Sequence, residues 1–352
     1  MLTPDYKTRL VEAAKNKKTD RPPCICPGGM MNMIVYEIME KAGVYWPDAH
    51  YNPNDMAKLT KSLRENGGFE NYGVPFCMTV EAEAMGAKVD MGSDLEEPHV
   101  VVSPLEDVID ISVLKNIDIS KGRINTVIES IKVLKSLDTD VPIVANLTGP
   151  VSVAGTLLDM TTLLMSFRKH PEDSAKMLDF ITDNLIVYAQ AMVEAGADVI
   201  CISEPSGTGE ILGKVHFENF TLPYVNKILD ALDVSVKIVH ICGRLHNIYE
   251  ALSKINCDVF SFDALVDIES IKPYLEDKAL MGNVSTHALG VMPSDKIISL
   301  TQNVIDKGID IVAPACGLPT TTPLENINAM VNTATGAYKI IQYSDIIEKN
   351  KL

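Results

Sequence analysis

The stretch that decides the fold is Val236-Lys237-Ile238-Val239-His240-Ile241-Cys242-Gly243. It is apolar, rich in β-branched residues and closed by a glycine, which is the pattern of a buried parallel strand. A similar run over residues 309–313 leads into Pro314-Ala315-Cys316-Gly317. The sequence therefore predicts two parallel strands that both end in potential metal ligands.

From about residue 142, strand-like runs alternate with helical ones. Strands are predicted at 143–146, 199–203, 237–241, 259–262, 279–283 and 311–313, and helices at 171–195, 216–232, 245–254, 294–307 and 324–343. This alternation predicts right-handed βαβ units around a parallel sheet. The number of strands and the chain length favour a closed (β/α)8 TIM barrel over an open doubly wound sheet. No G-x-G-x-x-G motif follows a strand, which also argues against the open sheet.

The N-terminal part is less regular. Helices are predicted within 1–18, 31–42 and 54–63, and short strands at 24–26 and 74–78. No linker-like segment separates this part from the rest. We therefore expect one barrel domain over 1–352, with 1–75 partly an N-terminal extension near the barrel mouth.

Composition limits the possible partners and the compartment. The 352 residues carry a formal net charge of −16, which argues against nucleic acid or an anionic membrane as a partner, because phosphate binding needs a basic surface. No apolar run reaches the roughly 18 residues of a membrane helix, and the first twenty residues are polar. The seven cysteines are odd in number and mostly lie in apolar strands. Reduced thiols and a cytoplasmic location are expected.

The clearest candidate site is a metal centre. His240 and Cys242 are two residues apart, so both leave the strand end on one side, and Cys316 arrives from another strand end. The carboxyl ends of barrel strands face one rim, where the active sites of such enzymes lie. One histidine and two cysteines with a fourth position free is the composition of a catalytic zinc site. The His-x-Cys spacing alone is weak evidence for a metal site, since buried cysteines usually serve as packing residues. However, a glycine follows each cysteine and allows close approach.

Polar residues follow other strand ends and should reach the same rim. Glu204 is the predicted catalytic group, either as a base near the metal or as the structural partner of a rim Lys or Arg. The predicted cofactor-binding residues are Asn146, Gly149, Asn283 and Ser285.

A zinc ion held by two thiolates and an imidazole suits the activation of a substrate thiol. Free thiols have a pKa of about 8.5, and coordination by a metal removes the proton. Hydrolysis by zinc-bound hydroxide is the competing chemistry, with Glu204 as its base.

The chain resembles the methylcobalamin:coenzyme M methyltransferases of the uroporphyrinogen decarboxylase superfamily over nearly its whole length. The motifs that carry the resemblance are Asp48-Ala49-His50-Tyr51-Asn52-Pro53, Pro75-Phe76-Cys77-Met78-Thr79-Val80, Asp90-Met91-Gly92, Glu194-Ala195-Gly196-Ala197-Asp198, His240-Ile241-Cys242-Gly243, Gly282-Asn283-Val284-Ser285 and Cys316-Gly317 with Thr322-Pro323-Leu324-Glu325-Asn326. The resemblance implies a (β/α)8 barrel with zinc on His240, Cys242 and Cys316. It also implies methyl transfer to a thiol such as coenzyme M from a methylated corrinoid, carried by a separate small corrinoid protein.

One departure affects the substrate. Where tetrapyrrole decarboxylases of the superfamily carry an arginine-rich motif, residues 23–29 contain no arginine, which argues against decarboxylation. Cys24 and Cys26 match no part of the methyltransferase pattern and leave the acceptor open. The alternative methyl acceptors are another thiol and tetrahydrofolate. The alternative functions are those of a uroporphyrinogen decarboxylase-like protein of other activity and of a corrinoid-binding or assembly protein without catalysis.

Overall fold

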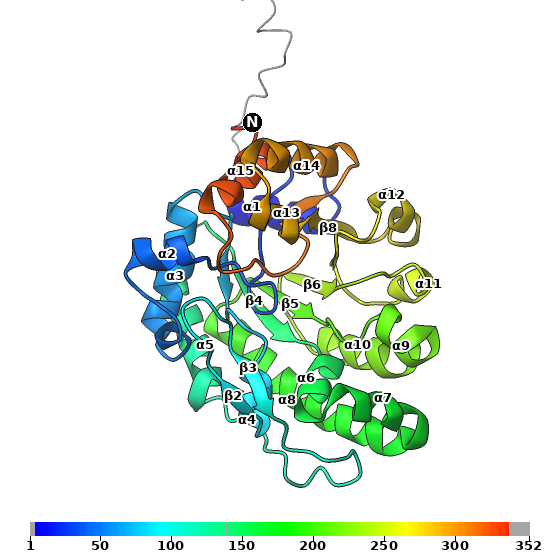
Figure 1. The fold of residues 1–352 in the computed structure, drawn as a ribbon. Coiled ribbons are helices and arrows are strands. Elements are labelled where there is room, and N and C mark those ends of the chain that lie inside the picture. Colours follow the sequence, from blue (N-terminus) through cyan, green and yellow to red (C-terminus); the bar gives the residue numbers. More distant parts are fainter. Residues whose placement is uncertain (1–3, 138–139, 338–352) are drawn as a thin grey trace, which may run out of the picture.

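The chain folds around a curled parallel sheet of seven strands. The computed structural model describes residues 4–137 and 140–337. The strands are β1 (Tyr72–Val74), β4 (Ile143–Thr148), β5 (Val199–Ser203), β6 (Val236–Ile241), β7 (Val259–Phe262), β8 (Ala279–Val284) and β9 (Ile311–Pro314). They pair in parallel in that order (Figure 1).

Residues 23–26 occupy the eighth place and close the barrel. On one side, Ile25 N donates to Val312 O (3.0 Å) and Val312 N donates to Pro23 O (2.9 Å). On the other, Glu70 N donates to Cys24 O (2.8 Å) and Cys26 N to Asn71 Oδ1 (2.9 Å). This segment therefore joins β9 to the approach of β1. Cys24 and Cys26 are fully buried in the barrel wall.

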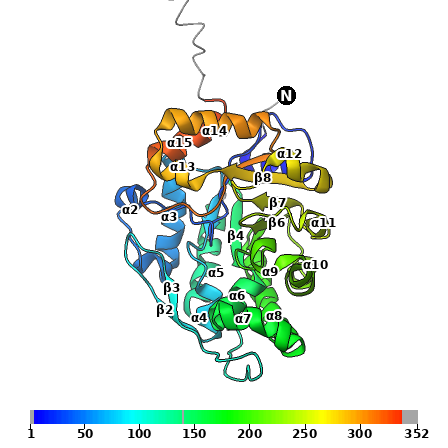
Figure 2. The ribbon, with the colours of Figure 1, turned by 45° about the vertical axis from the view of Figure 1, so that its right-hand side comes forward.

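Helices surround the sheet (Figures 1 and 2). Those that follow the strands in βα order are α5 (Gly122–Lys135), α8 (Pro171–Ala195), α10 (Leu222–Asp230), α11 (Tyr249–Leu252), α12 (Ile268–Ile271), α14 (Ser294–Asp306) and α15 (Leu324–Ala334). The N-terminal part contributes α1 (Tyr6–Ala14), α2 (Tyr36–Ala42), the 3-10 turn η1 (Asp48–His50) and α3 (Pro53–Glu65). Every residue of β4, β5, β8 and β9 is buried. The apolar runs of the sequence thus became strands covered on both faces.

Further short elements lie at the carboxyl ends of the strands. They are α4 (Val80–Met85), α6 (Pro150–Leu157), α7 (Met160–Lys169), α9 (Gly209–His216), the π-helix η2 (Phe217–Thr221), α13 (Thr286–Val291), and an antiparallel hairpin of β2 (Lys88–Asp90) and β3 (His99–Val102). Thr320 Oγ1 donates to Leu95 O (2.7 Å) and ties the hairpin loop to the segment after Cys316. The hairpin is therefore held beside the end of β9.

The predicted (β/α)8 fold is confirmed, and each strand predicted beyond residue 142 is present. The strand predicted at 74–78 instead ends at Val74, because Pro75 has no amide hydrogen to continue the ladder. The helix predicted at 245–254 is only α11, and the helix predicted from residue 31 begins at Tyr36. The last predicted helix ends at Ala334, and its residues 338–343 lie outside the described chain. The expectation of one domain over 1–352 stays a prediction.

Within the described residues, no individual helix has both the length and the hydropathy to cross a membrane. The consecutive helices α6 and α7 meet these criteria only when joined, and they bend by 111° where they meet.

Candidate metal and active site

The structure brings His240, Cys242 and Cys316 together at the carboxyl ends of β6 and β9. His240 Nε2 lies 3.0 Å from Cys242 Sγ, and Cys242 Sγ lies 3.4 Å from Cys316 Sγ. All three potential ligand atoms lie within 4.8 Å of one another. His240 is fully buried, whereas both cysteines are partly exposed. The imidazole thus forms the floor of the site and the thiols face the mouth.

A second layer of contacts orients the group. His240 Nδ1 lies 2.9 Å from Ser261 Oγ on β7, so the ring presents Nε2 to the thiols. A partner of this kind on the outer nitrogen is usual for a metal-binding histidine. Gly243 N donates to Asp263 Oδ2 (3.2 Å), which holds the turn after Cys242.

The two thiols form an electrostatic pair. Their hydrogen bond, together with His240, lowers the pKa of Cys316 against the opposing effect of burial. The same hydrogen bond, with burial, raises the pKa of Cys242. Cys316 is therefore the more acidic thiol of the pair. Metal binding requires thiolates and releases protons, so a divalent cation would displace any proton that the two thiols retain.

The three donors fit a zinc ion. In a tetrahedral site with ordinary Zn–S and Zn–N bonds, neighbouring ligand atoms are about 3.5 to 3.8 Å apart. The separations of 3.0 and 3.4 Å here are a few tenths of an ångström shorter. Small side-chain rotations can move the ligand atoms apart by this amount. Two sulfur donors and one imidazole also suit zinc better than magnesium or calcium.

Glu204 lies at the end of β5 and is fully buried. Its carboxylate accepts hydrogen bonds from Val151 N (2.9 Å), Gly207 N (2.9 Å) and Ser152 Oγ. Burial raises its pKa against these hydrogen bonds. The carboxylate thus binds the N-terminus of α6 and the turn after β5, and its catalytic role stays a prediction.

The predicted cofactor-binding residues have different surroundings. Asn283 Nδ2 donates to Asp263 O (3.0 Å) and Val266 O (2.9 Å), and Ser285 Oγ caps α13 by accepting from Ala288 N. Gly149 N donates to Ser203 O (2.7 Å) at the start of α6.

Asn146 differs from these three. Its Nδ2 donates to Ser203 Oγ (2.9 Å), while its buried Oδ1 has no hydrogen-bond partner among the described residues. Asn146 is therefore the member of this predicted set that offers a free polar atom.

Glu97 is an acidic residue within electrostatic range of Cys316, and the sequence analysis did not single it out. It lies in the loop between β2 and β3, is partly buried, and lines a cavity of about 420 Å³. Burial and the negative charge of Cys316 raise its pKa to about 7. The signal for this residue was the acidic loop Asp94-Leu95-Glu96-Glu97, but without a predicted hairpin it had no position relative to the site.

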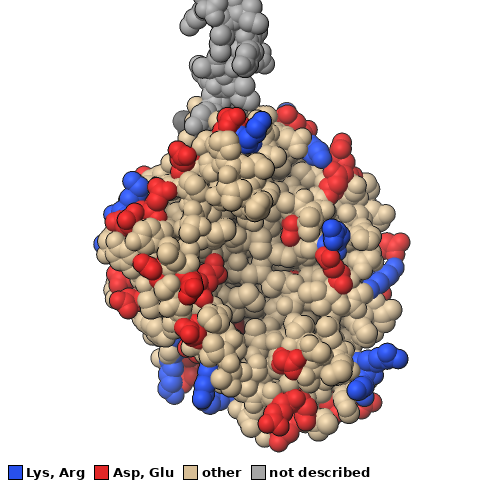
Figure 3. All heavy atoms as spheres, viewed as in Figure 1, with Lys and Arg blue, Asp and Glu red and all other residues tan. Residues whose placement is uncertain are grey.

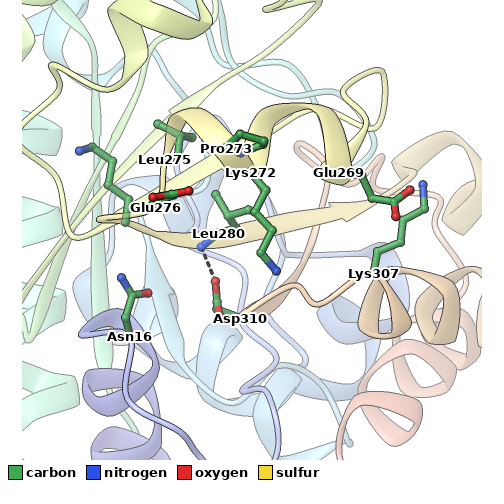
Figure 4. Close-up of a pocket in the computed structure, with 10 residues that line it drawn as sticks. Asn16, Glu269, Lys272, Pro273, Leu275, Glu276, Leu280, Lys307 and Asp310 are labelled. Carbon is green, nitrogen blue, oxygen red and sulfur yellow. Dashed lines mark hydrogen bonds between the residues drawn. The ribbon is translucent and has the colours of Figure 1, made fainter.

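A second cavity, of about 560 Å³, lies at the opposite end of the barrel (Figure 4). Its walls include Leu280 near the start of β8 and Asp310 just before β9, and Leu280 N donates to Asp310 Oδ2 (2.8 Å). The metal-ligand candidates are not part of it.

The fold and the ligand group together define a TIM-barrel protein with a candidate metal centre at its carboxyl-terminal face. Figure 3 shows that the face drawn in Figure 1 is hollowed near its centre, with acidic side chains on the rim of the hollow.

The family model described as "Uroporphyrinogen decarboxylase (URO-D)" matches residues 5–336, and the chain belongs to this family. Its relatives include methylcobamide:CoM methyltransferase MtaA of Methanosarcina barkeri, 34% identical over 92% of this chain and 96% of that protein. Methylcobamide:CoM methyltransferase MtbA of Methanosarcina acetivorans is 33% identical over 93% and 97%. A solved methyltransferase from Methanosarcina mazei superposes with a TM-score of 0.87 at 32% identity, over 95% of this chain and 99% of the other.

Proposed function

We propose that the protein is a zinc-dependent methyltransferase that moves a methyl group from a methylated corrinoid to a thiol. The observation that carries the proposal is the His240, Cys242 and Cys316 group, with separations of 3.0 and 3.4 Å. It lies in a chain about one third identical to two proteins named methylcobamide:CoM methyltransferases. In the overall reaction, an S–C bond forms, the Co–C bond breaks with its electron pair left on cobalt, and the thiol proton leaves.

The chain's residues would hold and orient the reacting groups. His240, fixed by Ser261, and the thiols of Cys242 and Cys316 would bind the zinc, which supplies Lewis acidity that lowers the pKa of the acceptor sulfur. The partly exposed thiols leave the open side of the group toward the mouth. Asn146 Oδ1 would accept a hydrogen bond from a bound substrate. Glu204 would keep α6 and the loop after β5 in place.

The methyl donor is proposed to be a methylcobamide carried by a small corrinoid protein that docks over the barrel mouth. Exposed apolar side chains lie on segments that follow strand ends, as docking requires. They are Ile211 and Val215 on α9, Leu265 after β7, and Val291 and Met292 at the end of α13. The free thiols of the described cysteines support a cytoplasmic location.

Removing one proposed ligand tests the metal centre. Purified protein is expected to hold about one zinc per chain and to demethylate methylcobalamin in the presence of a thiol. Cys316→Ala should lose most of the zinc and at least a hundredfold in rate, as zinc content by mass spectrometry and absorbance of the corrinoid would show. Cys257→Ala, which removes a buried thiol next to β7, is the matched control and should keep both.

The proposal fails if the protein holds no zinc and does not respond to added zinc. The acceptor is tested in the same assay with a panel of thiols and with tetrahydrofolate. Turnover with tetrahydrofolate but with none of the thiols would identify tetrahydrofolate as the methyl acceptor in place of a thiol. Corrinoid binding without turnover on any acceptor would indicate a binding protein rather than an enzyme.

A further inference from the structure

Asn32 is a buried asparagine that binds the loop carrying Cys316. It lies shortly after residues 23–26, which close the barrel, and its side chain is fully buried. Asn32 Nδ2 donates to Leu318 O (3.0 Å), and Leu318 N donates to Asn32 O (2.8 Å). The N-terminal part of the chain is therefore bonded in both directions to a residue just beyond a proposed metal ligand.

The amide of Asn32 is fixed in the orientation that this contact needs. Its Nδ2 also donates to Ile34 O (2.9 Å), and its Oδ1 accepts from Ile34 N (2.9 Å). The oxygen thus faces a donor, and both hydrogens of the nitrogen have an acceptor. Rotation of the side chain would leave buried polar groups unpaired, which is costly. Asn32 is therefore held in one geometry.

Gly317 brings the same two segments into direct contact. A Cβ at this position would clash with Met30 O and would lie 3.1 Å from Asn32 N. The absence of a side chain therefore allows the backbone of residues 30–32 to approach the loop closely. This loop begins with Cys316, so the contact lies immediately beside the thiol.

Cys316 needs such support more than the other two proposed ligands do. Those two belong to β6 or follow it directly, and β6 pairs with a strand on each side. Cys316 lies beyond the end of β9. Before it, Ala315 N still donates to Val284 O of β8 (2.8 Å), whereas after it Leu318 N donates to Asn32. Cys316 therefore lies where the chain passes from the sheet to Asn32.

We propose that Asn32 is a positioning residue that holds Cys316 within reach of a metal bound by His240 and Cys242. The inference rests on the proposed function, through its metal centre. Without the amide, Leu318 O would lose its partner and the loop could move away from β6. The site would then keep two ligands and lose the third. Outer groups that orient metal ligands commonly contribute about 10- to 100-fold in metal affinity.

Asn32→Ala in the full chain tests this role, and Asn326→Ala is the matched control. Asn326 is equally buried, and its amide also makes three hydrogen bonds, all to residues 289–294. These bonds connect the start of α15 to the end of α13 and the start of α14, and none of them involves the Cys316 loop. Both variants should lower the thermal midpoint by similar amounts. Only Asn32→Ala should alter the metal site.

Two measurements report on the metal and not on turnover. Zinc affinity is measured by competition with a chromogenic chelator, and Asn32→Ala should bind zinc at least tenfold more weakly than Asn326→Ala. Thiolate-to-metal absorption is measured on the cobalt(II)-substituted protein at full metal occupancy. Its intensity per cobalt should fall in Asn32→Ala toward that of a single thiolate, because Cys316 no longer coordinates. It should be unchanged in Asn326→Ala.

Gly317→Ala breaks the same contact from the opposite side. Its new methyl group would displace Met30 and Asn32 from the loop, so zinc affinity and cobalt absorption should fall as in Asn32→Ala. The losses of the two variants should not add in the double variant, because both remove one contact. Where Asn32→Ala yields too little folded protein, the cobalt absorption of Gly317→Ala decides, and an unchanged intensity overturns the inference.

The outcomes separate the inference from the proposed function. Zinc affinity and cobalt absorption that are the same in Asn32→Ala and Asn326→Ala overturn the positioning role, while the methyltransferase stands. A wild type that binds zinc but methylates no acceptor overturns the proposed function, and the variants still decide the role of Asn32. A wild type that binds no zinc overturns both.

Discussion

At the residue scale, His50 is a buried imidazole with an unusual environment. Its ring lies 5.0 Å from that of Trp46 and 6.2 Å from that of Phe76. Neither ring nitrogen has a hydrogen-bond partner among the described residues. Burial, and then the charge of Arg123, lowers the pKa of His50 to about 3. The folded protein therefore holds this imidazole neutral.

This environment predicts a pH-dependent contribution to stability. Below about pH 6.5, the unfolded chain takes up a proton that folded His50 refuses, so the free energy of unfolding falls as the pH drops toward 3. The slope from one such group is about 1.4 kcal/mol per pH unit. Denaturant unfolding at pH 7.5 and 5 should show His50→Phe losing about 1 to 2 kcal/mol less than wild type. The exposed-site variant His170→Gln should match wild type, and equal losses for His50→Phe would contradict the explanation.

Residues at strand ends were the ones that could be predicted. The buried apolar runs before His240 and Cys316 define two strands and place both residues at the carboxyl ends of these strands. Once the strands form a barrel, their carboxyl ends lie at one rim, so the two residues come together. Within the described part of the chain, the buried Oδ1 of Asn146 has no hydrogen-bond partner, and this depends on which neighbours arrive from distant segments. Sequence spacing does not contain that information.

At the element scale, the start of α6 is packed directly against Glu204. A Cβ on Gly149 would clash with the carboxylate of Glu204, whose Cδ would lie only 2.8 Å away. Gly149→Ala should therefore displace the carboxylate or the helix and cost about 1 to 3 kcal/mol of stability, measured by denaturant unfolding. Gly155→Ala in the same helix meets the flexible end of Met160 and, at ordinary contact distance, Leu163, so it should cost less, about 1 kcal/mol or below. Equal losses for the two variants would show that contact with Glu204 is not the cause.

The β2–β3 hairpin shows why some elements were missed. Its strands have only 3 and 4 residues and are largely exposed, so neither is long enough to display the extended alternation or the buried apolar run that marks a strand in a sequence. The strands of the barrel have covered faces and long apolar runs, which a single sequence displays plainly. Elements over the barrel mouth are held by individual contacts, such as the hydrogen bond from Thr320 to Leu95. Such contacts do not recur at a regular spacing along the chain, so a sequence pattern does not reveal them.

At the scale of the whole molecule, the exposed apolar side chains on segments after the strand ends predict where the proposed corrinoid protein would dock. Val215 and Val291 lie on α9 and α13, which both follow strand ends, and each is about two-thirds exposed. Val215→Asp with Val291→Asp should raise KM for a protein-bound methylcobamide at least tenfold, because the charges would be buried on docking. The rate with free methylcobalamin should not change.

Val187 provides the control for this surface. It is also exposed, but it lies on α8 in the outer wall of the barrel. Val187→Asp should behave as wild type with both donors. If the double variant loses activity equally with free and protein-bound donor, the mouth is not the docking surface.

The closure of the barrel by residues 23–26 has a consequence for synthesis of the protein. The barrel wall is completed where residues 23–26 bond to β9. β9 ends two residues before Cys316, the last of the proposed metal ligands. During translation, the ribosome must therefore deliver the chain through Cys316 before the ring can close or Cys316 can contact His240. Uptake of the proposed metal would then report that synthesis has passed β9.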